Sequence, residues 1–117
     1  MKIINSTNKI IITTSELAQL DPLPFTGLYA ISKSTLDKYA YSLNMELQLL
    51  NIKVVVLRAG AIKTTMLNVS TSQLDDFCSN TKLYKCNAKR FKSIVDNVEA
   101  KSALPIKVAQ KVNKILN

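Results

Sequence analysis

Two short runs of β-branched residues stand out in the first half of the chain. Residues 10–14 read Ile-Ile-Ile-Thr-Thr and lie between Asn-Lys on one side and the Asp-Pro-Leu-Pro stretch of residues 21–24 on the other. Residues 52–57 form the second run, with three valines at its centre and Gly60 soon after it. Continuous apolar runs of this length, bounded by turn-forming residues, predict two buried strands.

The segment between these runs predicts one long helix, over residues 27–50. It contains no proline, and Thr26 and Asn51 stand where an N-cap and a C-cap are expected. Apolar residues recur in it at helical spacing: Leu36, Ala40, Leu43, Leu47 and Leu50. Strand, helix and strand in this order, with both strands apolar nearly throughout, favour a parallel βαβ unit with a right-handed crossover.

The rest of the chain has a helical tendency and shows no further clear strand. Residues 70–99 contain few helix breakers, and Pro105 is placed to open a last helix through Val108, Val112 and Ile115. Two parallel strands make a poor sheet alone, because each strand needs neighbours and helices on both faces. The fold class is therefore α/β, with the two strands belonging to a larger parallel sheet.

Composition restricts the choice of class and of chemistry. The chain has 117 residues, 16 Lys plus Arg against 8 Asp plus Glu, and 47% hydrophobic residues; it suits a single globular domain over residues 1–117. No apolar run approaches the roughly 20 residues that span a bilayer, and the first residues lack the apolar segment of a signal peptide. We therefore expect a cytoplasmic protein and no membrane partner.

The residues available for chemistry exclude several kinds of site. The chain contains 2 Cys and no His, so we expect no four-ligand zinc site, no metal and no disulfide scaffold. Without His, no Ser-His or Cys-His nucleophile pair can form. Any acid or base chemistry falls to Tyr, Lys or a carboxylate.

One set of residues meets that requirement at the predicted sheet edge. Ser15 follows the first strand, and Tyr29 and Lys33 lie four residues apart on one face of the helix. Ligands of open α/β sheets bind beyond the carboxyl ends of the strands, where these residues meet if the loop before the helix returns to that edge. The alternatives are a half-buried Tyr beside a solvated Lys, and Thr13 or Thr14 in the place of Ser15.

These motifs, in this order, resemble the short-chain dehydrogenase/reductase family. The resemblance rests on Ser15, on the Tyr-x-x-x-Lys of residues 29–33 and on Arg-Ala-Gly-Ala-Ile-Lys-Thr at 58–64, and it covers residues 8–67 closely. It implies a Rossmann-like doubly wound sheet and an oxidoreductase that interconverts an alcohol and a carbonyl with NAD or NADP. Tyr29 would exchange a proton with the substrate oxygen, Lys33 would assist Tyr29 and bind the nicotinamide ribose, and Ser15 would hold the substrate. The cofactor-binding residues implied are Tyr29, Lys33, Ala59, Gly60, Ile62 and Thr64.

The chain also departs from the family pattern. Ala59 stands where the family usually has Pro, and the two glycines, Gly27 and Gly60, belong to no Gly-x-x-x-Gly-x-Gly turn. No Asn-Asn-Ala-Gly element precedes Ser15. The sequence therefore predicts the C-terminal catalytic half of such a domain, without its dinucleotide-binding half and with little or no cofactor binding alone. By the same resemblance, the choice between NAD and NADP depends on residues after the second strand of the missing half.

Two rival interpretations compete with an enzyme. A non-catalytic interaction module would use a second face of helix 27–50, with Tyr41 and Met45, to form a homo-oligomer or to bind a separately encoded N-terminal half. Residues 77–117 hold 9 Lys plus Arg and 2 acids, which suits an anionic partner, but aromatic residues are few there and we do not expect nucleic-acid binding. Candidate substrate-pocket residues, equally explained as helix core, are Met66, Leu67, Leu74, Phe77, Leu83, Tyr84 and Phe91.

Overall fold

The computed structural model describes residues 8–117, which belong to two compact units, Met1–Ala59 and Gly60–Asn117. The first unit contains strand β1 (Asn8–Ser15), a 3-10 turn η1 (Glu16–Ala18), helix α1 (Gly27–Leu47), a 3-10 turn η2 (Gln48–Leu50) and strand β2 (Ile52–Ala59). The second contains helices α2 (Thr65–Asn80), α3 (Lys85–Ala100) and α4 (Pro105–Leu116). Each unit is described by itself below.

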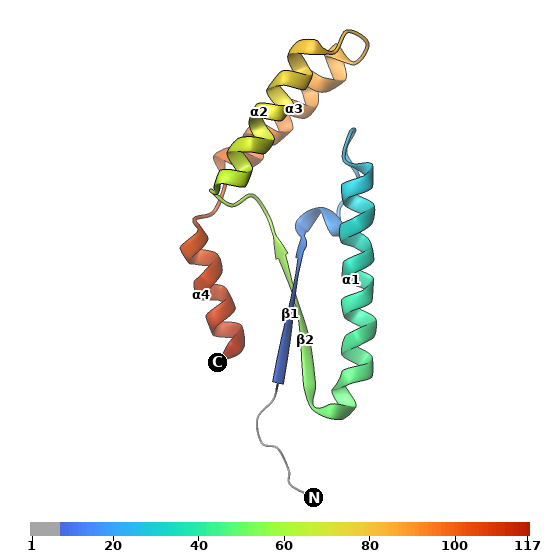
Figure 1. The fold of residues 1–117 in the computed structure, drawn as a ribbon, viewed down its shortest axis with the longest axis vertical. Coiled ribbons are helices and arrows are strands. Elements are labelled where there is room, and N and C mark those ends of the chain that lie inside the picture. The colour runs from blue at the N-terminus through green and yellow to red at the C-terminus, as the bar shows by residue number, and fades with distance from the viewer. Residues whose placement is uncertain (1–7) are drawn as a thin grey trace, which may run out of the picture. The chain divides into compact units, whose positions relative to one another are not determined.

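The predicted βαβ unit is confirmed. Strands β1 and β2 pair in parallel, with partners running from Asn8 and Ile52 at one end to Ser15 and Ala59 at the other, and α1 lies alongside them (Figure 1). Both strands continue past the apolar runs in the sequence, because ladder pairing uses the backbone and does not stop where the side chains become small or polar. Ser15 and Ala59 therefore meet at the same edge of the sheet, as expected.

The face of α1 that packs on the sheet includes three of the five predicted positions, Ala40, Leu43 and Leu47. Leu36 is 37% exposed and Leu50, which lies beyond α1 in η2, is 68% exposed, so the predicted apolar stripe is wrong at these two positions. The buried and half-buried positions of the helix recur every three or four residues: Ala30, Lys33, Ser34, Asp37, Ala40, Leu43, Asn44 and Leu47. Small and polar side chains dominate this stripe, and they let the helix backbone come close to the strands.

The ends of α1 are set by backbone conformation. Thr26 occupies the N-cap position as predicted, but its hydroxyl donates to the carbonyl of Leu23 and makes no cap hydrogen bond. At the other end the helix tightens into η2 and stops at Asn51, whose φ of 56° places it in the left-handed region. Asn tolerates that region better than most residues, which explains why it terminates the helical segment.

A carboxylate on α1 joins the helix to both strands. Thr14 Oγ1 donates to Asp37 Oδ1 at 2.7 Å, and Arg58 donates to Asp37 Oδ2 from Nε and Nη2, each at 2.8 Å. Thr14 and Arg58 are register partners in the sheet. About two turns further along α1, Asn44 Oδ1 accepts the backbone N–H of Val54 at 2.9 Å. These bonds fix the position of α1 along the strands.

The opposite face of the sheet has no such cover within residues 8–59. Because Thr14 and Arg58 reach toward α1 and side chains alternate along a strand, Ile11, Val55 and Leu57 face the other way. All three are only half-buried, and in this unit the only long helix, α1, lies on one side of the strands (Figure 1). A buried parallel sheet needs helices on both faces, and the larger sheet inferred from the sequence stays a prediction.

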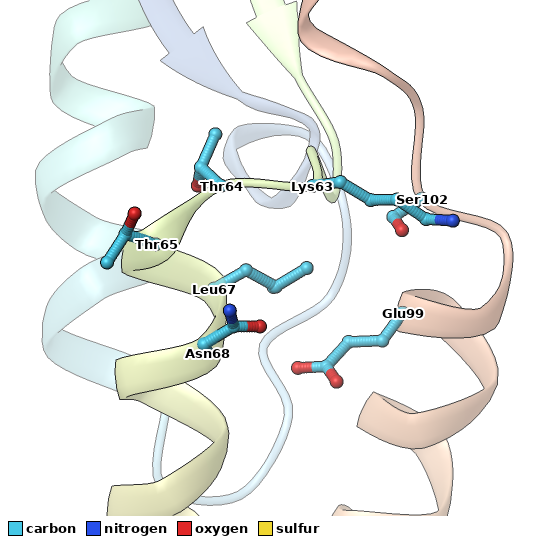
Figure 2. Close-up of a pocket in the computed structure, with 7 residues that line it drawn as sticks. All are labelled: Lys63, Thr64, Thr65, Leu67, Asn68, Glu99 and Ser102. Carbon is cyan, nitrogen blue, oxygen red and sulfur yellow. The ribbon is translucent and has the colours of Figure 1, made fainter.

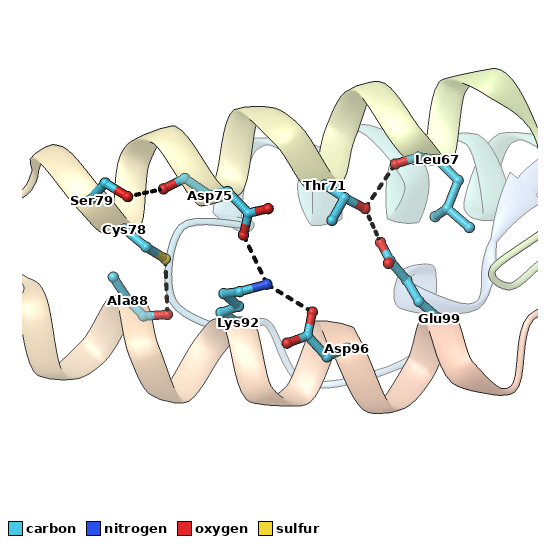
Figure 3. Close-up of polar contacts among 9 residues, drawn as sticks. All are labelled: Leu67, Thr71, Asp75, Cys78, Ser79, Ala88, Lys92, Asp96 and Glu99. Atoms are coloured by element: carbon cyan, nitrogen blue, oxygen red, sulfur yellow. Dashed lines mark hydrogen bonds and ion pairs between the residues drawn. The ribbon is translucent and has the colours of Figure 1, made fainter.

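In the second unit, α2 and α3 form an antiparallel hairpin (Figure 3). Lys92 of α3 lies between Asp75 of α2, at 2.8 Å, and Asp96 of its own helix, at 3.1 Å. The hydrogen bonds that the Lys92 ammonium donates to these two carboxylates, above all the one to Asp75, hold its pKa above its usual range. Ala88 of α3 is fully buried, and its carbonyl accepts a hydrogen bond from Cys78 Sγ of α2 at 3.5 Å.

The remaining contacts of this unit include one that the sequence did not indicate. Ala103, after α3, forms an isolated parallel bridge with Ile62: Lys63 N donates to Ala103 O at 3.0 Å, and Ala103 N donates to Ala61 O at 2.9 Å. The bridge ties the segment after β2 to the end of the helical hairpin. Helix α4 begins at Pro105, as the sequence predicted.

We expect Asp37→Asn to destabilise the first unit by about 1–2 kcal/mol. The substitution keeps the size of the side chain but removes the charge from a hydrogen bond to Arg58, and charged hydrogen bonds contribute more than neutral ones. Urea denaturation followed by circular dichroism measures the effect. Asp21→Asn, in the exposed loop before α1, is the matched control, and equal stability of the two variants would contradict the role of Asp37.

We expect Ala88→Leu to destabilise the α2–α3 hairpin by about 1–3 kcal/mol, because the larger side chain must push two closely packed helices apart. Ala100→Leu, at the exposed end of the same helix, should change the free energy of unfolding little. Amide hydrogen exchange in α2 and α3 measures the loss. Unchanged protection in Ala88→Leu would show that the helices are not held close there.

Candidate functional site

Tyr29 and Lys33 lie together on the first turns of α1. The Nζ atom of Lys33 is 5.5 Å from the centroid of the Tyr29 ring, which is a cation–π distance. Tyr29 is 48% exposed and Lys33 is half-buried. The helical spacing therefore gives the proximity that the Tyr-x-x-x-Lys motif requires, with the phenol open to a ligand and the ammonium beside it.

The position of these two residues follows from the Asp37 contact. Tyr29, Lys33 and Asp37 follow one another at intervals of four along the same side of α1, and Asp37 is level with Thr14 near the end of β1. Helix α1 runs opposite to the strands, so residues before Asp37 extend past their carboxyl ends. At 1.5 Å per residue, Lys33 lies about 6 Å and Tyr29 about 12 Å further along the helix axis. That is the region where α/β sheets bind ligands.

Ser15, the last residue of β1, is buried and has a structural role. Its Oγ accepts the backbone N–H of Leu17 at 3.2 Å and so caps η1. No hydrogen bond joins Ser15 to Tyr29 or Lys33 among the described residues. An oxygen that accepts one hydrogen bond still has its own proton to donate, so capping leaves that proton available to a ligand.

The two threonines considered in place of Ser15 differ from it. The hydroxyl of Thr14 is already committed to Asp37 at 2.7 Å, and Thr13 is exposed. Ser15 is the residue of the three that combines a position at the strand end with an uncommitted hydroxyl proton. The role of Ser15 in the site stays a prediction.

The expected cofactor-binding segment divides between the two units. Ala59 ends β2 in the first unit, whereas Gly60, Ile62 and Thr64 belong to the second. The bridge to Ala103 uses the carbonyl of Ala61 and the N–H of Lys63, so it does not use the backbone groups of Ile62. Thr64 precedes α2 in an extended conformation, and its hydroxyl makes no cap hydrogen bond.

A pocket of about 580 Å³ opens beside this segment, wholly within the second unit (Figure 2). Its lining is mainly polar: Lys63, Thr64, Thr65, Leu67, Asn68, Glu99 and Ser102. Of the apolar pocket candidates from the sequence, only Leu67 is present. Asn68, Glu99 and Ser102 were not identified from the sequence, because residues on separate helices converge only once the α2–α3 hairpin has formed.

Residues 8–117 contain no group of three His, Cys, Asp or Glu side chains placed to hold a metal ion. Nor does this described part of the chain include a helix with the length and apolar character needed to cross a bilayer.

Comparison with known proteins identifies the family. The family model described as short chain dehydrogenase matches residues 1–75, more than half of the 117-residue chain. The chain belongs to the short-chain dehydrogenase family, and the match includes β1, α1, β2 and the start of α2. A search of curated proteins and a search of solved structures gave no match.

We expect Ser15→Ala to lower the stability of the chain by about 1 kcal/mol through loss of the η1 cap. Ser15→Asn, which keeps a side-chain acceptor that caps well, should recover most of this loss. Chemical denaturation of the two variants and the wild type measures the difference. Equal destabilisation by both substitutions would show that capping is not what Ser15 contributes.

Proposed function

We propose that this chain carries the catalytic residues of an NAD(P)-dependent oxidoreductase that interconverts an alcohol and a carbonyl. The observation that carries the proposal is the placement of Tyr29 and Lys33 on one side of α1, beyond the carboxyl ends of two parallel strands. Membership of the short-chain dehydrogenase family supports the class of reaction.

In this proposal Tyr29 is the acid/base residue. Its phenol exchanges a proton with the substrate oxygen, and its exposure makes the hydroxyl accessible. Lys33 assists this proton exchange from its position beside the Tyr29 ring, and it also binds the nicotinamide ribose. Ser15 donates its hydroxyl proton to the substrate oxygen while its Oγ continues to accept from Leu17.

The residues after β2 suit a nicotinamide cofactor. The carboxamide of nicotinamide needs both donors and acceptors, and the segment offers the backbone of Ile62, left unused by the bridge, and the uncapped hydroxyl of Thr64. Ala59 and Gly60 allow the chain to turn at the strand end. The cofactor, NAD or NADP, would supply the hydride, which no side chain can donate.

We further propose that residues 1–117 form the C-terminal part of a single Rossmann-like domain completed by a dinucleotide-binding half. Three observations support this: the uncovered face with Ile11, Val55 and Leu57, the small number of buried apolar side chains among residues 8–117, and the lack of a glycine-rich turn. Alone, the chain would bind cofactor weakly and turn over little. A cytoplasmic location is part of the same proposal.

A second candidate is a non-catalytic module that acts through α1. The outward side of this helix carries large apolar residues that are exposed in the described structure, among them Leu28, Ile31, Tyr41 and Met45. Tyr41 and Met45 were expected to form a second buried face, and such a face suits a homo-oligomer or a separately encoded N-terminal half. Stability of the chain alone, compared with its stability beside such a partner, separates this candidate from the enzyme.

The test begins with the coding sequence upstream of Met1. If it encodes Gly-x-x-x-Gly-x-Gly and Asn-Asn-Ala-Gly in frame, the joined protein should oxidise alcohols or reduce carbonyls, followed at the absorbance of NAD(P)H. In that protein Tyr29→Phe should lower turnover by at least about a hundredfold, since it removes the proton donor. Tyr39→Phe, on the same helix and also exposed, is the matched control.

Either of two results would contradict the enzyme proposal. One is an upstream sequence that carries neither element. The other is a Tyr29→Phe variant as active as Tyr39→Phe. Circular dichroism of both variants checks that loss of turnover is not loss of the fold.

A further inference from the structure

The loop that joins η1 to α1 spans the first two turns of the helix. It begins after Ala18, whose carbonyl accepts from the Ser34 hydroxyl at 2.9 Å, and it ends at Gly27, where α1 starts (Figure 1). Gly27 and Ser34 are separated by roughly 10 Å along the helix axis. Residues 19–26 therefore cover the length of α1 that carries the proposed Tyr-Lys pair.

This loop is apolar for a connection at the surface. It reads Gln-Leu-Asp-Pro-Leu-Pro-Phe-Thr over residues 19–26, and Asp21 is its only charged residue. The side chains of Leu20 and Phe25 are 58% and 49% exposed. Folding of the first unit thus leaves hydrocarbon of the loop in contact with solvent.

Phe25 has a backbone conformation that disfavours a bulky residue. Its φ is 69°, in the left-handed region, and the N–H of Thr26 donates to the carbonyl of Leu23 at 3.1 Å. That bond closes a four-residue turn with Pro24 second and Phe25 third, which is the pattern of a type II turn, and Gly or Asn is favoured at its third position. The Thr26 hydroxyl donates to the same carbonyl at 2.7 Å and helps to hold the turn.

Burial offsets the strain at Phe25 only in part, because about half of its side chain stays exposed. Asn51, which is also in the left-handed region, shows the type of residue that such a position favours. Residues held in strained backbone conformations cluster at sites that bind ligands. The exposed ring of Phe25 is thus better explained by a ligand than by the fold.

The sequence around Tyr29 holds few charges for a ligand. From Ser15 to Leu36, Lys33 is the only cation, and the proposed function assigns it to the tyrosine and to the cofactor ribose. On this segment a phosphate or carboxylate of a substrate would have no cation of its own. A polyol would place hydroxyl groups against hydrocarbon without hydrogen-bond partners, whereas an aliphatic group has neither cost.

We propose that Phe25 determines substrate specificity, and that the alcohol or carbonyl substrate carries an aliphatic body that lies against its ring. The loop supplies apolar contact, while Ser15 and Tyr29 bind the polar group of the substrate. This inference rests on the proposed function and deepens it by naming the substrate class. The rival occupant of the loop is the dinucleotide-binding half, and binding measurements separate the two.

Three alcohols probe the loop in the 117-residue chain, and backbone amide signals in NMR follow their binding. 2-Octanol has an aliphatic body, glycerol is polar throughout, and glycerol 3-phosphate carries an anion. 2-Octanol should shift the amides of residues 20–29 saturably. It should bind at least about tenfold more tightly than the other two, because its methylene groups gain most by leaving water.

Two substitutions of Phe25 separate the ring from the turn. Phe25→Asn suits the left-handed backbone but removes apolar surface, so the urea midpoint should stay or rise while the affinity for 2-octanol falls at least about fivefold. Phe25→Leu keeps both the strain and an apolar side chain, and it should retain the affinity within about twofold. Leu49→Asn, at a position of the same unit that is 89% exposed, is the matched control and should leave the affinity unchanged.

In the joined protein, the measurement is the selectivity between alcohols. Phe25→Asn should raise KM for 2-octanol at least about tenfold with kcat little changed, because the ring contacts the substrate away from the reacting oxygen. It should not lower kcat/KM for glycerol. Tyr29→Phe instead removes turnover of every alcohol, so failure of the specificity proposal and failure of the oxidoreductase proposal are distinguishable.

Several outcomes would overturn the role of Phe25. Glycerol or glycerol 3-phosphate binding at residues 20–29 as tightly as 2-octanol would contradict an aliphatic substrate. Unchanged 2-octanol affinity in Phe25→Asn, or equal shifts around Leu49, would show nonspecific contact. A urea midpoint lower in Phe25→Asn than in Phe25→Leu would assign the ring to the fold. Loss of the 2-octanol shifts in the joined protein would make the loop an interface with the dinucleotide-binding half.

Discussion

The carboxylate of Asp37 is the interaction on which the geometry of the first unit depends. It accepts from Thr14 on β1 and from Arg58 on β2, so one side chain of α1 is bonded to both strands at the same level of the sheet. Small residues on the helix, such as Ala30 and Ala40, permit close approach but give little control over sliding along the strands. The charged bonds supply that control, and they thereby set how far Tyr29 and Lys33 extend past the strand ends.

The sequence and the structure agree best where the information is local. Continuous β-branched runs fixed both strands, and a spacing of four residues placed Lys33 beside Tyr29, because both follow from the repeat of a single element. Leu36 and Leu50 were assigned to the buried face because they are apolar and recur at helical spacing. The structure buries Ser34, Asp37 and Asn44 more, since their hydrogen bonds to other elements offset the cost of burying polar groups.

The features that join segments distant in the chain could not be predicted from a sequence pattern. The bridge between Ile62 and Ala103 involves two residues without strand-like neighbours, and the pocket brings Lys63 near Glu99 through a helical hairpin. Nothing in the composition of residues 60–117 marks those partners, because Ile62 and Ala103 look like ordinary apolar residues and Lys63 and Glu99 like ordinary charged residues of a basic helical region. For Ser15, the sequence predicted the position at the end of the strand. It did not predict that the hydroxyl accepts a capping hydrogen bond from the Leu17 N–H.

The parallel pairing of β1 with β2 also bears on the order of folding. Asn8 pairs with Ile52 across the whole of α1, so a long loop must close before the ladder gains its first bond. The α2–α3 contacts, such as Cys78 with Ala88, join residues much closer in the chain. Local contacts form faster than distant ones. Counted from the synthesis of its own last residue, the α2–α3 hairpin would therefore form faster than the β1–β2 sheet. The backbone groups of β1 would remain unpaired until β2 has been synthesised and the loop has closed.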